Sequence, residues 1–132
     1  MKYLLDTDTC IYALKQNEKT LRHLLSTARE DVAISVITEA ELRTGAAKSS
    51  SPAKTLPLIE NFLHPLTIID FTSDDAIAYA SVRAKVERSG IPIGPLDTLI
   101  ASQAVARELI LVTNNEREFR RVAGLHLENW TR

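Results

Sequence analysis

The sequence lacks most of the residues and segments that would mark a secreted or membrane-bound protein. A single cysteine among 132 residues excludes an internal disulfide and any metal site built from several thiolates. No apolar run approaches the ~20 residues of a membrane-spanning helix, and residues 1–5 are too short for a signal peptide. We therefore expect a soluble protein of the cytoplasm with no membrane association.

An excess of charge of one sign is also missing. The chain has 16 lysines and arginines against 17 acidic residues, a formal net charge of −1. No overall electrostatic attraction to nucleic acid or to anionic membranes follows from this balance, although a local basic surface is not excluded. A chain of this length and ordinary composition, with 45% apolar and 25% charged residues, forms one domain, residues 1–132.

Continuous apolar runs alternate with helical patterns along the chain. Strands are predicted at residues 2–5, 32–35, 66–71 and 109–113, with a last edge strand at 125–128. A first helix is predicted after a cap at Thr7 or Asp8, and further helices at about 18–28, 36–47, 53–64, 72–90, 96–108 and 114–121. Thr72 and Asp75 have the spacing of a capping box at the start of the 72–90 helix. Strands that alternate with helices in this way predict an α/β domain with a largely parallel sheet.

Acidic side chains lie at or near the carboxyl ends of the predicted strands, where an open parallel sheet forms its ligand crevice. Asp6 follows the first apolar run directly, and Asp8 follows two residues later. Glu41 lies on the helix after the second strand, and Asp97 begins a helix behind a loop stiffened by two prolines. The turn Thr113–Glu116 follows the fourth strand. We expect these groups to meet in one crevice.

Several carboxylates in a partly dry site repel one another unless they are protonated or bridged by a cation. Ligands that are all oxygen select a hard cation such as Mg²⁺ or Mn²⁺. Such an ion activates water and stabilises charge on a phosphoryl group. The pattern therefore indicates hydrolysis of phosphodiester bonds.

Each of these residues also has a purely structural interpretation. Asp8 is favoured as the cap of the first helix, and Asp97 is equally well placed to cap its own helix. Glu41 fits a solvent-facing helix position as well as a site residue. The arginines after the fourth strand fit either a solvated surface or contacts to a phosphate backbone; they are Arg117, Arg120 and Arg121.

Four segments together resemble a known family, the PIN-domain ribonucleases, and most closely the VapC toxins of bacterial toxin–antitoxin pairs. They are Leu5–Asp8, Thr38–Gly45, Ile93–Ala101 and Leu111–Phe119. The resemblance covers nearly the whole chain. It implies a three-layer α/β/α sandwich with a four- to five-stranded, mainly parallel sheet.

The resemblance also implies roles for individual residues. Asp6, Glu41 and Asp97 would be the acids of a Mg²⁺-dependent endoribonuclease, in which Mn²⁺ could substitute. Asp6 and Asp97 would bind the metal, and Glu41 would complete its shell or position the attacking water. Family members commonly have a fourth acid after the last core strand, where this chain has Asn114 and Asn115.

The resemblance leaves the fourth acid to be supplied by Glu116 or Glu118, and we expect Glu118 to be catalytic. Further residues are expected to support the acids or contact RNA; they are Thr7, Asp8, Thr113, Asn115, Glu116, Arg117, Arg120 and Arg121. The resemblance implies an RNA substrate. The forms of the motifs at residues 93–97 and 113–119 resemble the subgroup that cleaves initiator tRNA in its anticodon loop.

The family implies partners as well. We expect a homodimer that joins a cognate antitoxin in a larger assembly, with the C-terminal segment of the antitoxin in the acidic crevice. An arginine inserted there would neutralise the clustered carboxylates.

Two other readings of the sequence remain. The Asp6-Thr7-Asp8 sequence after an apolar strand resembles the first motif of the haloacid-dehalogenase phosphatases, in which the first acid is the nucleophile and the second the general acid. The acidic pair Asp74-Asp75 precedes Lys85, which is the wrong order for that family. A PIN-fold interaction module without catalysis is the other alternative.

Overall fold

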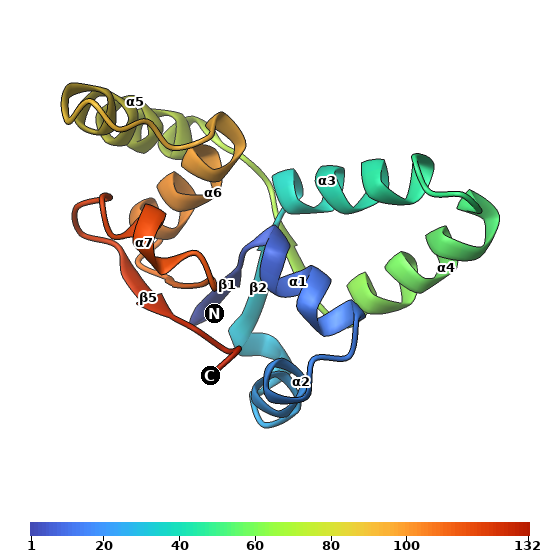
Figure 1. Ribbon diagram of the computed structural model, residues 1–132. Helices are drawn as coiled ribbons and strands as arrows, with labels where there is room; N and C mark the ends of the chain where they lie inside the picture. The colour runs from blue at the N-terminus through green and yellow to red at the C-terminus, as the bar shows by residue number, and fades with distance from the viewer.

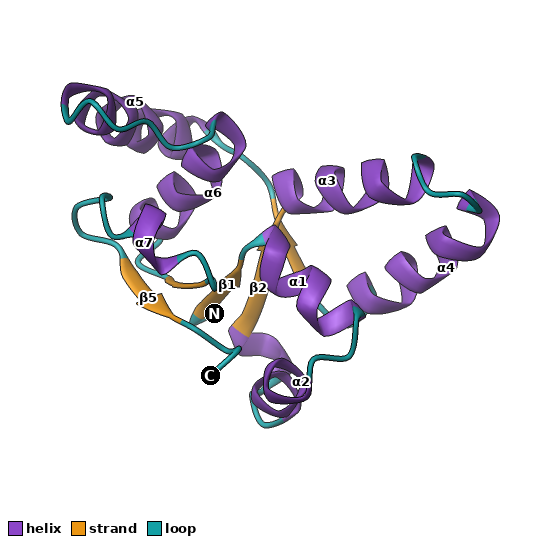
Figure 2. Ribbon diagram, in the orientation of Figure 1, coloured by secondary structure: helices purple, strands orange, loops and turns teal.

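The structure is a computed structural model that describes residues 1–132, and its centre is a five-stranded parallel sheet (Figures 1 and 2). The strands are β1 (Tyr3–Leu5), β2 (Val32–Ser35), β3 (Thr67–Ile69), β4 (Ile110–Val112) and β5 (His126–Glu128). They are ordered β3-β2-β1-β4-β5, and every neighbouring pair is parallel. The expected α/β/α sandwich is confirmed, and the edge strand predicted at 125–128 is present as β5.

Helices cover both faces of the sheet (Figure 1). One group consists of α1 (Thr7–Leu14), α2 (Glu18–Leu25), α3 (Val36–Ala47) and α4 (Pro52–Leu63). The other group consists of α5 (Ser73–Arg88), α6 (Pro95–Ala106) and the short α7 (Glu116–Phe119). A single 3₁₀ turn at Arg29–Asp31 leads into β2. No helix combines the length and apolar character needed to span a membrane.

The two helix layers enclose separate hydrophobic cores, one on each face of the sheet. Successive side chains of a strand point to opposite faces, so neighbours in sequence enter different cores. Leu4 packs among residues of α5, α6 and α7, whereas Leu5 packs with Cys10, Trp130 and residues of α3 and α4. Both leucines are fully buried. This arrangement explains why the inner strands β1 and β4 are continuously apolar and do not alternate with polar residues.

The strand order reverses between β1 and β4, and their carboxyl ends lie side by side there. The chain goes from β1 to β2 on one side and later returns to β4 on the other, which is the reversal where open α/β sheets bind ligands. Leu5 is paired with Val112 in the sheet register. Asp6 and Thr113, the residues that directly follow β1 and β4, therefore lie side by side.

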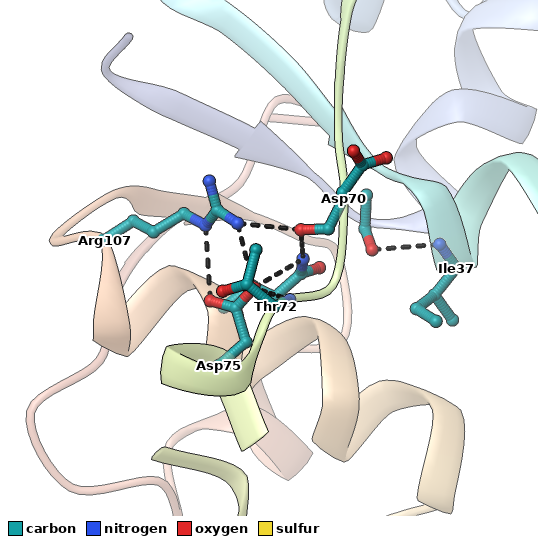
Figure 3. Close-up of polar contacts among 7 residues, drawn as sticks. Ile37, Asp70, Thr72, Asp75 and Arg107 are labelled. Carbon is teal, nitrogen blue, oxygen red and sulfur yellow. Dashed lines mark hydrogen bonds and ion pairs between the residues drawn. The ribbon is translucent and has the colours of Figure 1, made fainter. Parts of the chain in front are cut away.

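An ion pair between Arg107, half-buried at the C-terminal end of α6, and the buried Asp75 joins α6 to a neighbouring element (Figure 3). Arg107 donates from Nη2 to Asp75 Oδ2 at 2.9 Å and to the Asp70 carbonyl at 2.7 Å. Asp75, which is 1% exposed, also accepts the Thr72 N–H in the predicted capping box. Burial would raise the pKa of Asp75, but the hydrogen bonds from Arg107 and Thr72 lower it below its ordinary value. The pair ties α6, which carries Asp97 at its other end, to the first turn of α5, and the Asp70 carbonyl adds a contact to the segment between β3 and α5.

Two helices are shorter than the sequence predicts. The second ends at Leu25 instead of residue 28, and the hydroxyls of Ser26 and Thr27 there both donate to the His23 carbonyl. Hydroxyl groups that bond to nearby backbone compete with continuation of a helix. The last helix spans only Glu116–Phe119, because the preceding turn is closed by the Asn115 N–H on the Thr113 hydroxyl.

Candidate active site

Asp6 caps the helix that begins directly after β1. Its backbone is extended, and its Oδ1 accepts the Thr9 N–H at 2.8 Å. The expectation that Asp8 or Thr7 caps this helix is wrong, because Thr7 is already its first residue and Asp8 lies exposed in its first turn. One carboxylate, that of Asp6, therefore both ends the strand and begins the helix.

The carboxyl group of Asp6 is 3% exposed and is nevertheless not paired with a cation. Burial raises its pKa from 3.8 to about 6, and the nearby charge of Asp8 contributes in the same direction. Hydrogen bonds from Thr113 and Thr9 lower the pKa but offset only part of this effect. Asp6 is thus a buried carboxylate held in place by hydroxyl and amide groups, with no positive partner.

Glu41 reaches the end of β1 from α3. Its Oε1 accepts a hydrogen bond of 2.7 Å from the hydroxyl of Thr7, the residue after Asp6, and that hydroxyl also lies 3.2 Å from the Thr38 hydroxyl. Glu41 is half-buried, so it is not a freely solvated helix residue. Thr7 therefore links two acids that are 35 residues apart in the sequence.

Asp97 is the third residue of α6 and does not cap it, because the N-cap position belongs to Gly94. Its side chain is free to face the crevice, and its pKa is raised from 3.8 to about 6. Burial is the largest cause, and the remainder is repulsion by four other carboxylates, in decreasing order those of Glu118, Asp6, Glu41 and Asp8. Asp97 thus lies within the electrostatic field of all the expected acids.

The choice between Glu116 and Glu118 for the fourth acid is decided by their partners. Glu118 Oε1 accepts the Gly94 N–H at 3.3 Å, one turn before Asp97, and its Oε2 accepts from the side chain of Asn115. Glu116 instead forms an ion pair of 2.7 Å with Arg132 near the C-terminus. Glu118 lies with the other acids, whereas Glu116 is engaged away from them.

None of the three arginines expected at the crevice forms an ion pair with Asp6, Glu41, Asp97 or Glu118. Arg117 is exposed, and Arg120 is 3.7 Å from the carboxylate of Glu116. Arg121 lines a cavity with residues of α5 and with Val105. Val105 comes eight residues after Asp97, about 12 Å along the same helix. The structure therefore does not bring Arg121 to the acids.

Sequence reasoning missed three polar contributors. Thr9 is buried and donates its hydroxyl to the Val112 carbonyl, which joins α1 to the end of β4. Thr38 is buried next to Thr7. Tyr12 accepts a hydrogen bond of 3.1 Å from the Asn114 amide, so this asparagine is turned toward α1. Two signals for Thr38 exist in the sequence: it begins the Thr38–Gly45 segment of the family resemblance, and it lies three residues from Glu41 on one helix face.

The donor set fits a hard divalent cation. The four clustered acids are Asp6, Glu41, Asp97 and Glu118, and none of them forms a salt bridge. Their uncompensated repulsion, seen in the raised pKa of Asp97, is what a cation would relieve. No three acidic, histidine or cysteine side chains lie close enough to enclose an ion by themselves. Mg²⁺ suits such a site because it is commonly held by one or two carboxylates and keeps several waters.

Comparison with protein families and relatives gives one consistent result. A model of the family described as "PIN domain" matches residues 3–125. The chain is 39% identical over 130 residues to "tRNA(fMet)-specific endonuclease VapC" of Salmonella typhimurium, covering 98% of each chain. It is also 39% identical over 132 residues to "Ribonuclease VapC2" of Rickettsia felis, again with 98% of each chain covered.

Solved structures agree with these relatives. The toxin chain in the DNA-bound VapBC complex of Salmonella typhimurium superimposes with a TM-score of 0.93 at 39% identity, covering 98% of each chain. That of the promoter-bound VapBC2 complex of Rickettsia felis gives 0.91 at 39% identity, with 98% of this chain and 99% of that chain covered. The similarity thus extends over the whole domain, including every segment that supplies an acid.

Proposed function

The chain belongs to the PIN-domain family and, within it, to the VapC ribonucleases, and we propose that it is a metal-dependent endoribonuclease that cleaves initiator tRNA. The observation that carries the proposal is the convergence of Asp6, Glu41, Asp97 and Glu118 without a paired cation. A bound Mg²⁺ or Mn²⁺ would lower the pKa of a coordinated water and stabilise negative charge on the phosphoryl group.

The residues of the chain hold the reacting groups in place. Asp6 and Asp97 are the proposed metal ligands, since both are acids whose ionised forms lack a positive neighbour. Glu41 uses Oε1 to accept the Thr7 hydroxyl, which leaves Oε2 to accept a proton from the attacking water. Glu118 adds a fourth negative charge and is fixed to the start of α6 through the Gly94 N–H.

Initiator tRNA is proposed as the substrate because relatives that are 39% identical over 98–99% of the chain are named tRNA(fMet)-specific endonucleases. The anticodon loop suits the site, since unpaired nucleotides can be splayed out for recognition and attack. The acids of the site bind the metal, so the RNA backbone must be held by basic groups outside it.

A cognate antitoxin is proposed as the partner. The similar solved chains are the toxins of VapBC complexes, two of them bound to DNA. A guanidinium of the antitoxin placed among the four acids would form charge-assisted hydrogen bonds and displace the cation. We also propose a homodimer as the toxin unit of this assembly.

The test uses purified protein without antitoxin, with initiator tRNA and elongator methionine tRNA as parallel substrates. We expect cleavage of the initiator tRNA in its anticodon loop with Mg²⁺ or Mn²⁺, and none with EDTA. Glu41→Gln should abolish this cleavage, whereas Glu39→Gln should retain it, because Glu39 is paired with Arg43 on the same helix. Cleavage that persists in EDTA would contradict the metal-dependent mechanism.

A second pair of variants separates the nuclease from the phosphatase reading. Asp97→Asn should stop RNA cleavage, and Asp8→Asn should leave most of it, because Asp8 is exposed and forms no hydrogen bond with Glu41 or Glu118. A phosphatase of the haloacid-dehalogenase type would instead lose activity on Asp8→Asn and would form an acyl-phosphate on Asp6.

A further inference from the structure

A mostly apolar hollow lies directly beside the acids, between α3 and α6. It is lined by Ile37, Ala40, Glu41 and Thr44 of α3 and by Leu96 of α6, and its volume is about 310 Å³. Leu96 is 45% exposed, and Ala40 and Thr44 are exposed as well. The lining residues of α3 are three, four and seven positions apart and so share one face of the helix. The fold itself therefore leaves an apolar surface open at this place.

The hollow is continuous with the proposed active site at two points. Glu41 belongs to both, since its carboxylate lines the hollow and accepts the Thr7 hydroxyl next to Asp6. Leu96 is the residue immediately before Asp97. A phosphate held at the acids would consequently place an adjoining nucleotide over this surface, and the volume lies at the small end of the ~300–1,000 Å³ range of small-molecule sites.

The polar groups at the edge of the hollow act as hydrogen-bond acceptors. The Thr44 hydroxyl donates its own proton to the Ala40 carbonyl at 2.8 Å, which leaves its lone pairs to accept. The Glu41 carboxylate, when ionised, can only accept. An exocyclic amino group, as on adenine, cytosine or guanine, has two N–H donors, one for each acceptor. Uracil has a single ring N–H flanked by two carbonyl oxygens, which the acceptors of Thr44 and Glu41 would repel.

Resting on the nuclease function proposed above, we propose that this hollow binds the nucleobase next to the scissile phosphate and prefers a base with an amino group. The apolar side chains of Leu96, Ile37 and Ala40 would contact the face of the ring. The Thr44 hydroxyl and the second lone pair of Glu41 Oε1 would accept from its amino group, which leaves Oε2 for the attacking water. The hollow would then contribute to the choice of the cleaved bond, in addition to the chemistry supplied by the acids.

The first experiment removes one base at a time from the RNA. After the cleaved bond has been mapped, each of the two nucleotides that flank it is replaced in turn by an abasic residue. We expect Leu96→Ala to lower kcat/KM about tenfold on the intact RNA, as for one lost contact in an apolar pocket, and to have almost no effect on the RNA that lacks the relevant base. Leu96→Met should restore most of the activity.

The second experiment tests the preference for an amino group. Wild-type protein should cleave RNA with adenine or cytosine at this position faster than RNA with uracil. Thr44→Val keeps the shape of the side chain and removes the acceptor, so it should reduce this preference without stopping cleavage. A preference that is unchanged in Thr44→Val would overturn the role of the hydroxyl.

Matched controls distinguish failure of this proposal from failure of the proposed function. Leu58→Ala removes a leucine on α4 that is 62% exposed and should have no effect on any of these RNAs. If no RNA is cleaved by wild-type protein, the nuclease function itself fails. If RNA is cleaved but Leu96→Ala is equally active on all substrates, the base site fails. If Leu96→Ala instead changes the sedimentation of the protein from dimer to monomer, a second copy of the chain occupies the hollow, and the base site is likewise wrong.

Discussion

Replacing Asp6 with asparagine is expected to make the metal-free protein more stable while it removes the activity. The carboxyl group is 3% exposed, and no lysine or arginine forms a salt bridge with it. Asparagine has nearly the same shape and keeps the side-chain oxygen that accepts the Thr9 N–H at the start of α1. Asp6→Asn therefore removes a buried charge and leaves the helix cap in place.

The size of the effect follows from the pKa of Asp6, which burial raises from 3.8 to about 6. A difference of about two units corresponds to roughly 3 kcal/mol of unfolding free energy, since one unit equals ~1.4 kcal/mol. The sign is fixed because the folded protein holds this proton more tightly than the unfolded chain. The wild-type protein thus loses stability as the pH rises from about 4 to about 6, and the full cost is present above that range.

Urea unfolding in EDTA measures this difference. Asp6→Asn should raise the unfolding free energy by roughly 2–3 kcal/mol at pH 8 and should have little effect at pH 4, where the carboxyl group is protonated in the folded protein. Asp70→Asn, at an exposed position, should have no comparable effect at either pH. Added Mg²⁺ should stabilise the wild-type protein and not Asp6→Asn. If Asp6→Asn does not raise the unfolding free energy at pH 8, or raises it equally at pH 4, the buried charge of Asp6 is not the cause.

Three further predictions concern the surroundings of the site. Arg107→Met leaves Asp75 buried without its partner, so the unfolding free energy should fall by about 2–4 kcal/mol in urea; an unchanged midpoint would show that the ion pair does not hold α6. Thr7→Val removes the hydrogen bond to Glu41 and should lower kcat about tenfold with KM for RNA nearly constant, and Thr7→Ser should recover the loss. Arg121→Ala should change kcat/KM less than twofold, about the precision of such assays, because this residue lines a cavity near the C-terminal end of α6; a large loss would place RNA on that face.

Much of the fold could be predicted because its signals are local. Each buried strand is a short apolar run, and the helices between them have their own spacing and capping residues. The capping box of Thr72 and Asp75 was predicted from two residues and is present. Helix ends were predicted less well, as at Leu25 and Phe119, because hydroxyl groups and turns that end a helix compete only weakly with its continuation.

The site could be predicted only in part. That Asp6, Glu41 and Asp97 would share a crevice follows from the rule that carboxyl ends of parallel strands meet at one edge of a sheet. This rule does not say which residue caps a helix. The sequence favours Asp8 as the cap of the first helix, but in the structure the cap is Asp6. A capping residue is defined by an extended backbone and an N–H two or three positions later, and several nearby acids satisfy the same pattern.

The sequence by itself determined the parallel α/β sheet and the acids at its strand ends, because both depend on short apolar runs and on the residues that directly follow them. Only the tertiary structure shows which glutamate lies beside the other acids. Glu116 and Glu118 are two residues apart on one short helix, but Glu118 meets the Gly94 N–H and Glu116 meets Arg132. These partners come from distant parts of the chain, and only the packing of α6, α7 and the C-terminal residues around the sheet brings them within hydrogen-bonding distance.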